Sequence, residues 1–135
     1  MEISPRLHHY CQNITKDHLQ DMVEMYKLLG FDVVYTPPPS KFPWIMVGQS
    51  RLRFAIQITE VSDTPIENLD KKRQTHIAFL SDNPQEIIDK IRVWAEGKGF
   101  KFRDGGWSKI ERYFDLPDIF VNFVVEVMHT SIEKS

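Results

Sequence analysis

Short segments in which apolar and polar residues alternate indicate β-strands along most of the chain. The clearest alternation covers residues 51–61. Its two faces carry different side chains: Leu52, Phe54, Ile56 and Ile58 on one, and Arg53, Ala55, Gln57 and Thr59 on the other. This pattern predicts a strand with an apolar back and a mixed front. Segments rich in strand-forming residues predict seven more strands, at 7–14, 31–36, 44–47, 75–80, 100–103, 112–115 and 120–128.

A helical period replaces this alternation in the segment after residue 18. Apolar residues there fall three and four apart, at Leu19, Met22, Val23, Tyr26 and Leu29. Asp17 is the expected N-cap, Gln20 completes a capping box, and Gly30 ends the helix. The pattern predicts an amphipathic helix of about three turns.

A second helix is predicted in the later half of the chain. Asp82 or Asn83 is its expected N-cap, Pro84 lies in its first turn, and Gly97 and Gly99 end it. Its expected buried stripe is Ile87, Ile88, Ile91, Trp94 and Ala95.

Proline and glycine mark the expected turns. Three prolines at 37–39 remove successive backbone donors and end the strand before them. Turn residues also occur at 48–50, 104–106 and 116–118. Residues 62–74 have no sustained periodicity, so we expect a surface linker whose basic run at 71–73 is exposed to solvent.

The order strand, helix and three strands occurs twice, which indicates an internal repeat. His9 and His76 are 67 residues apart, and Gln57 and Glu126 are 69 residues apart. Because these spacings are nearly constant, we predict two superposable βαβββ modules.

The predicted modules cover residues 6–61 and 75–129 of a single α+β domain, 1–135. One module has a single helix for a four-stranded sheet, which leaves the other sheet face open to water. Pairing of the modules would form a cup-shaped or partly open eight-stranded mixed sheet with the helices outside. The polar front positions would then line the inside of the cup.

Composition narrows the possible functions. Among 135 residues, 27% are charged and the formal net charge is −2, which favours neither nucleic acid nor a membrane surface as a partner. The longest apolar stretches are too short to span a bilayer, and the first residues do not resemble a secretion signal, so we expect a cytoplasmic protein. Cys11 is the only cysteine, which excludes an internal disulfide and a multi-thiolate zinc site.

The repeat brings four potential metal ligands to equivalent inward positions: His9, Gln57, His76 and Glu126. Glu126 lies among valines, where a bare carboxylate is costly and needs a cation. His9 and His76 with Glu126 would suit Fe(II), Mn(II), Ni(II), Co(II) or Zn(II). Gln57 does not titrate and fits better as a hydrogen-bonding residue of the pocket than as a base.

Each of these interpretations has an alternative. Glu126 could instead form an ion pair with Arg53 or Arg112, and a slip of one residue would turn His8 inward in place of His9. The remaining candidates for a substrate pocket are Arg53, Trp44, Trp107, Tyr113 and Phe114, although aromatic residues in small barrels more often belong to the core or to a dimer interface.

Four sequence segments resemble the vicinal oxygen chelate superfamily, which includes glyoxalase I, bleomycin-resistance proteins, fosfomycin-resistance enzymes and extradiol dioxygenases. They are Leu-His-His-Tyr at 7–10, Tyr-Lys-Leu-Leu-Gly-Phe at 26–31, Thr-His-Ile-Ala-Phe at 75–79 and Val-Glu-Val at 125–127. The resemblance implies that His9, His76 and Glu126 bind a divalent metal. Gln57 stands where bacterial glyoxalase I has a glutamate ligand, which disfavours the glyoxalase reaction, and the turn at 116–118 lacks the glycine usual in the family.

Three functions are compatible with this pattern. The first is a metal-dependent isomerase, lyase, dioxygenase or thiol transferase that acts on a small oxygenated substrate, with Glu126 or a water it controls moving a proton. The second is metal-free drug binding of the bleomycin-resistance type. The third is an interaction protein whose old site is vestigial. A homodimer is expected in each case, because such modules can pair within a chain or across a two-fold axis.

Overall fold

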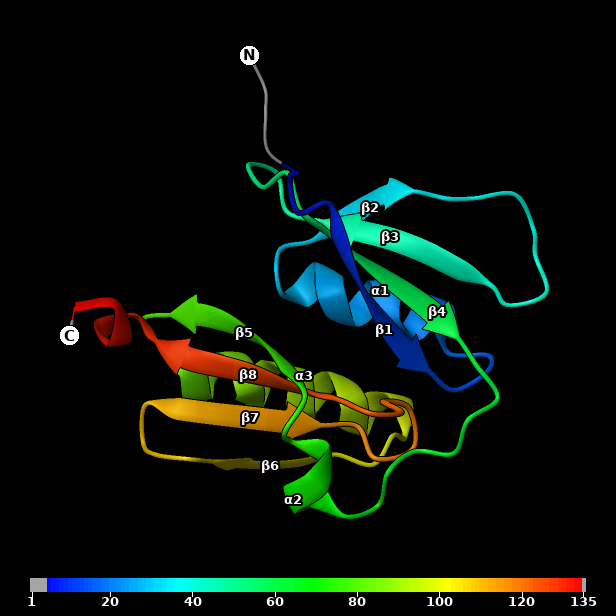
Figure 1. The fold of residues 1–135 in the computed structure, drawn as a ribbon. Helices are drawn as coiled ribbons and strands as arrows, with labels where there is room; N and C mark the ends of the chain where they lie inside the picture. Colours follow the sequence, from blue (N-terminus) through cyan, green and yellow to red (C-terminus); the bar gives the residue numbers. More distant parts are fainter. Residues whose placement is uncertain (1–4, 135) are drawn as a thin grey trace. The chain divides into compact units, whose positions relative to one another are not determined.

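The computed structural model describes residues 5–134 and divides into two compact units, with the boundary between Val61 and Ser62. The first unit contains β1 (His9–Ile14), α1 (Leu19–Leu28), β2 (Asp32–Tyr35), β3 (Trp44–Gly48) and β4 (Ala55–Glu60). Its sheet has the order β1-β4-β3-β2, with β1 parallel to β4 and the other pairs antiparallel. Figure 1 shows α1 against one face of this sheet.

The second unit repeats this arrangement. It contains a short helix α2 (Leu69–Lys72), then β5 (His76–Ser81), α3 (Pro84–Lys98), β6 (Arg103–Gly106), β7 (Glu111–Asp115), β8 (Val124–His129) and a 3₁₀ helix (Thr130–Lys134). The sheet order is β5-β8-β7-β6, and α3 packs against β5, β7 and β8 (Figure 1). The predicted α+β class and its two βαβββ modules are confirmed. Of the helices in the described chain, none is long and apolar enough to cross a membrane.

The pairing register is the same in both units. In the first, His9 lies opposite Ala55, two residues before Gln57. In the second, His76 lies opposite Val124, two residues before Glu126. Equivalent side chains therefore occupy equivalent places on the two sheets, as the constant spacing predicts.

Each helix covers an apolar sheet face. In the first unit, alternate residues of β4 and β3 pack with α1, including the fully buried Ile56 and Ile58. In the second, Val125 and Val127 of β8 have no exposed surface and lie on the α3 side. Because side chains alternate along a strand, Gln57 and Glu126 project from the opposite faces of their sheets.

Both long helices end at a glycine with a left-handed backbone. Gly30 has φ +86° and Gly99 has φ +79°. The amide of the residue after each glycine donates back to the helix, from Phe31 to the Tyr26 carbonyl and from Phe100 to the Ala95 carbonyl. This is the Schellman arrangement, which confirms both predicted ends.

The predicted capping of α1 by Asp17 is wrong. His18 is the N-cap, its side chain accepts no hydrogen bond from a backbone amide of the helix, and Asp17 has φ +69°. Instead, the Leu19 amide donates to Oε2 of Glu60, at 3.2 Å. A carboxylate from the neighbouring β4 thus supplies the negative group that favours a helix start.

Three predicted strands need correction. The strand expected at 51–61 begins only at Ala55, because the amides of Arg51 and Leu52 turn back to the Gln49 carbonyl. The strand expected at 120–128 begins at Val124. The strand expected at 100–103 is β6, at Arg103–Gly106, so the glycines interpreted as a turn are inside a strand. A Cβ at Gly105 would lie 2.5 Å from the Tyr113 hydroxyl, so only glycine lets the two strands approach.

The expected linker is also more ordered than predicted. It belongs to the second unit and contains α2, where the Asn68 side chain accepts a hydrogen bond from the Lys71 amide. Lys72 is fully buried rather than solvated, and its Nζ lies 2.8 Å from Asp115 Oδ1. Arg103 Nε donates to the other oxygen of Asp115, also at 2.8 Å. The Asp115 carboxylate supplies the opposite charge that a buried lysine needs.

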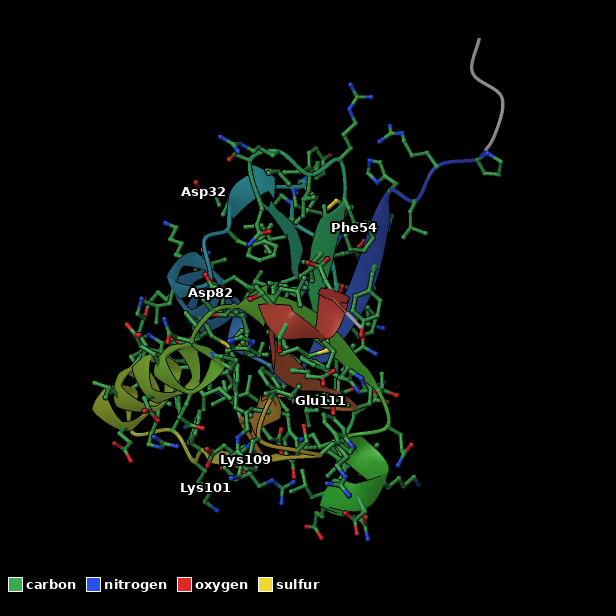
Figure 2. The ribbon with its side chains drawn as sticks, turned by 90° about the vertical axis from the view of Figure 1, so that its left-hand side faces the viewer. Asp32, Phe54, Asp82, Lys101, Lys109 and Glu111 are labelled. Atoms are coloured by element: carbon green, nitrogen blue, oxygen red, sulfur yellow. The ribbon has the colours of Figure 1, made fainter. Side chains whose placement is uncertain are left out.

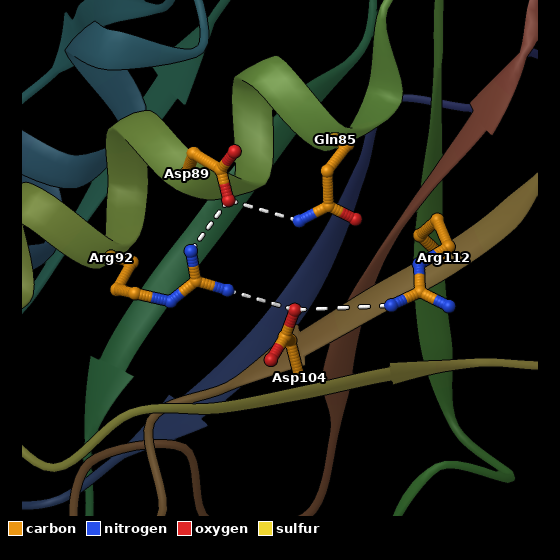
Figure 3. Close-up of polar contacts among 5 residues, drawn as sticks. All are labelled: Gln85, Asp89, Arg92, Asp104 and Arg112. Carbon is orange, nitrogen blue, oxygen red and sulfur yellow. Dashed lines mark hydrogen bonds and ion pairs between the residues drawn. The ribbon is translucent and has the colours of Figure 1, made fainter.

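Figure 3 shows a polar chain that connects α3 to the adjacent strands. Arg92 of α3 bonds Asp89 on its own helix and donates through Nη2 to Asp104 of β6, at 2.9 Å. Asp104 also lies 3.9 Å from Nη2 of Arg112 on β7. Arg112 therefore pairs with Asp104, and its predicted alternative pairing with Glu126 is wrong.

Two glycines near the end of α3 should respond oppositely to alanine. No heavy atom lies within 4 Å of a Cβ built at Gly97 or Gly99, so backbone conformation decides the effect. We expect Gly97→Ala to raise the free energy of unfolding by about 0.5–1 kcal/mol, and Gly99→Ala to lower it by about 1–2 kcal/mol because of its positive φ. Urea unfolding measures both, and equal effects would contradict this account of the helix end.

Candidate functional site

The second unit brings two of the predicted metal ligands together. His76 opens β5 and Glu126 lies on the adjacent strand β8. The His76 Nε2 atom lies 3.2 Å from Glu126 Oε1. The histidine side chain is one-third exposed, whereas that of glutamate is 7% exposed. The pair is thus reachable from solvent on its imidazole side only.

The other ring nitrogen of His76 fixes the protonation of the ring. Nδ1 lies 2.9 Å from the carbonyl oxygen of Arg73. A carbonyl only accepts, so Nδ1 carries the proton and donates it. In neutral His76, Nε2 then has a lone pair that points towards the Glu126 carboxylate.

The environment of Glu126 makes this contact unusual. Burial raises the pKa of its carboxyl above the ordinary value, the charge of His76 opposes the rise, and the nearby Glu111, labelled in Figure 2, adds to it. A buried carboxylate facing a lone pair is repulsive. A proton or a metal cation between the two groups would remove this repulsion.

The donor atoms fit a divalent metal. Two metal–ligand bonds of about 2.1 Å that meet at roughly 90–110° place their donors about 3.0–3.4 Å apart, and the observed separation is within this range. Nδ1–H bonded to a carbonyl is also the usual outer contact of a metal-binding histidine. Neither unit alone gathers three or more His, Cys, Asp or Glu side chains of the described residues, so His76 and Glu126 form a two-ligand half-site.

Aromatic and cationic side chains border this half-site. The Trp107 ring centroid lies 5.0 Å from the rings of both His76 and Tyr113. The Arg73 guanidinium lies over Trp107 and Tyr113, at 5.6 and 5.8 Å. The sequence predicts Trp107 and Tyr113 near the site but misses Arg73, because the basic run at 71–73 was assigned to a solvated linker. Its position three residues before His76 was the available signal.

His9 lies on the first unit, at the start of β1. It is exposed and shares a sheet face with Cys11, which lies opposite Gln57 in the parallel pairing. His8 precedes the strand, and its Nδ1 lies 2.9 Å from the Nδ1 of His9. The register therefore puts His9, rather than His8, on the Gln57 face.

The remaining predicted residues lie in different places. Gln57 donates to the Thr59 hydroxyl at 3.0 Å. Trp44 packs against Tyr35 and lines a cavity of about 210 Å³ beside the proline run at 37–39. Arg53 lines a larger cavity in the first unit. Phe114 is fully buried, which fits its alternative interpretation as a core residue.

Solved structures with the same fold include enzymes and binding proteins. The fosfomycin resistance protein of Listeria monocytogenes, solved with Mn(II) and 1S,2S-dihydroxypropylphosphonic acid, has a TM-score of 0.60 and 17% identity over 98% of this chain and 97% of its own. Glyoxalase I of Leishmania major has a TM-score of 0.64 and 16% identity over 97% and 92%. An antibiotic-binding protein from Streptomyces sp. CB03234 has a TM-score of 0.52 and 14% identity over 96% and 98%.

No protein-family model and no curated protein sequence matches this chain. The structural similarities confirm the predicted resemblance at the level of the fold. A fold shared by enzymes and binding proteins does not define the reaction.

Replacing Glu126 with glutamine should change how stability depends on pH in metal-free protein. Because the folded carboxyl keeps its proton above the ordinary pKa of 4.5, the folded protein binds more protons than the unfolded chain there. The wild-type free energy of unfolding should therefore fall as pH rises through the raised pKa, and Glu126→Gln should lack this loss.

Urea unfolding between about pH 4.5 and 8 measures the difference, since this interval begins at the ordinary carboxyl pKa. Glu96→Gln, at an exposed position of α3, is the matched control and should keep the wild-type slope. Parallel curves of unfolding free energy against pH for wild type and Glu126→Gln would show that burial does not raise the pKa of the Glu126 carboxyl.

Proposed function

We propose that this protein is a divalent-metal-dependent enzyme that acts on a small oxygenated molecule, with His76, Glu126 and His9 as metal ligands. The observation that carries the proposal is the contact between His76 Nε2 and Glu126 Oε1. The two groups both carry lone pairs and lie 3.2 Å apart, and Nδ1 donates its proton to the Arg73 carbonyl oxygen. His9 would add the third ligand, from the same chain or from a second copy.

The fold similarity supports the same proposal. A fosfomycin resistance protein with this fold was solved with Mn(II) and a dihydroxylated phosphonic acid. Two imidazoles and one carboxylate suit the metals from Mn(II) to Zn(II) and leave coordination positions for a ligand.

A bound divalent metal would act as a Lewis acid on an oxygen of the substrate. Glu126, or a water held by it, would accept a proton from the substrate. Gln57, at the equivalent place in the first unit, is an amide and supplies no second base. Trp107 and Tyr113 would pack against the bound molecule and exclude water.

Metal affinity tests the ligand set. Chelator-treated protein titrated with Mn(II), Ni(II), Fe(II), Co(II) or Zn(II) should bind one ion per chain and gain thermal stability. We expect His76→Ala, Glu126→Gln and His9→Ala each to weaken metal binding by at least about 10–100-fold. Losing a residue that only hydrogen-bonds to a metal ligand already costs this much affinity, and these residues are the proposed ligands themselves. Calorimetry and elemental analysis measure affinity and stoichiometry.

His18→Ala is the matched control, because His18 also lies beside a carboxylate, Asp21, at 2.9 Å, and is similarly part-buried, but it belongs to the start of α1 and is not a proposed ligand. It should keep wild-type affinity. Wild-type protein without stoichiometric metal binding, or equal losses in His18→Ala and His76→Ala, would refute the proposed centre.

A second candidate function is metal-free binding of a planar molecule. The partly exposed Trp107, packed with Tyr113 beneath the Arg73 guanidinium, favours it, and an antibiotic-binding protein has the same fold. For this function, His9→Ala would leave ligand binding nearly intact, whereas Trp107→Ala would weaken it.

We also propose that the protein is a homodimer. Within each unit, α1 or α3 covers one face of the sheet, so the face with Gln57 or Glu126 is available to a second sheet. Light scattering at micromolar concentration should give twice the chain mass of 15.9 kDa, and a strict monomer would rule the dimer out.

A further inference from the structure

A cavity of about 600 Å³ lies entirely on the first unit. It is bordered by the segment before β1, by β2 and β3, and by the loop that leads to β4. Phe54, labelled in Figure 2, marks the end of this loop. The volume is in the range typical of small-molecule sites.

Three basic side chains line the cavity: Arg6, His8 and Arg53. Arg6 Nη1 donates to the backbone carbonyl of Arg53 at 3.3 Å, which brings the two arginines to the same edge. None of the lining residues is Asp or Glu. Because a guanidinium is always charged, this edge carries two permanent positive charges without a carboxylate in the lining to balance them.

The rest of the lining is largely apolar. Met46 is buried, whereas Leu52 is 57% exposed and Tyr35 is 50% exposed. Exposed large apolar side chains in a concave, cationic setting are typical of ligand sites rather than of a solvated face. Such a lining fits a molecule with an anionic end and an aromatic body.

We propose that this cavity is a binding site for a small aromatic oxyanion, with Arg6 and Arg53 on its anionic group and Tyr35, Leu52 and Phe54 around its ring. Guanidinium groups bind phosphate and carboxylate oxygens through paired, charge-assisted hydrogen bonds. The site does not require the metal centre. His8 lines the cavity, and its Nδ1 lies 2.9 Å from Nδ1 of His9 within the same unit.

Phenyl phosphate is a suitable probe, with inorganic phosphate and phenol as its anionic and aromatic parts. Titration of the chelator-treated full chain, followed by amide chemical shifts, should give binding at millimolar concentration or tighter for phenyl phosphate, with shifts confined to the cavity residues. Both partial probes should bind at least about tenfold more weakly, because each lacks one set of contacts. Added salt should weaken the binding.

Arg6→Met and Arg53→Met should each weaken phenyl phosphate binding by about tenfold. Arg51→Met is the matched control, because Arg51 is exposed on the same loop but does not line the cavity, and it should bind normally. All three positions are exposed, and unchanged amide spectra would verify that each variant is folded.

Four results would overturn the proposal: no binding at about 10 mM, equal affinity for phenol, equal affinity for inorganic phosphate, or unchanged affinity in Arg53→Met. The result does not depend on the metal proposal, because His76→Ala, which removes a proposed metal ligand, should bind phenyl phosphate as the wild type does. Phenyl phosphate binding that is lost in His76→Ala and kept in Arg53→Met would assign the anion to the second unit instead.

Discussion

The chemistry of the candidate site depends on one short contact between two groups that both offer lone pairs. Nε2 of His76 faces Oε1 of Glu126 at 3.2 Å, and the hydrogen bond from Nδ1 to the Arg73 carbonyl prevents the ring from turning its proton towards the acid. Burial further disfavours the charged form of the Glu126 carboxyl and raises its pKa. A cation or a shared proton relieves both costs, so the same arrangement that would destabilise a bare pair makes it a good metal half-site.

The internal repeat explains why this contact occurs where it does. The first unit has the same strand order and register, so His9 and Gln57 occupy the places of His76 and Glu126. An amide replaces the acid there, and the neighbouring cavity is lined by arginines instead of carboxylates. One backbone plan thus supports an acidic half-site in one unit and a cationic cavity in the other.

Local patterns predicted the modules and the C-terminal ends of both long helices, because alternation and glycine stops are encoded by neighbouring residues. The choice between His8 and His9 stayed open until the strand register was known. Features that depend on distant contacts were missed. The burial of Lys72 depends on its ion pair with Asp115. The strand at Gly105 depends on the close approach of Tyr113. The hydrogen bond from His76 to the Arg73 carbonyl depends on the path of the chain before β5. The cavity of the first unit depends on Arg6 and Arg53, 47 residues apart in sequence.

The protonation of the His76 ring tests the central claim most directly. Nitrogen-15 spectra of the imidazole, recorded on chelator-treated protein before and after one equivalent of Zn(II), report each ring nitrogen separately. The account predicts that Nδ1 keeps its proton throughout and that Nε2 alone takes the shift of a metal-bound nitrogen. A neutral ring with its proton on Nε2 instead of Nδ1 would contradict it. Imidazole nitrogen shifts that do not change when Zn(II) is added would also contradict it.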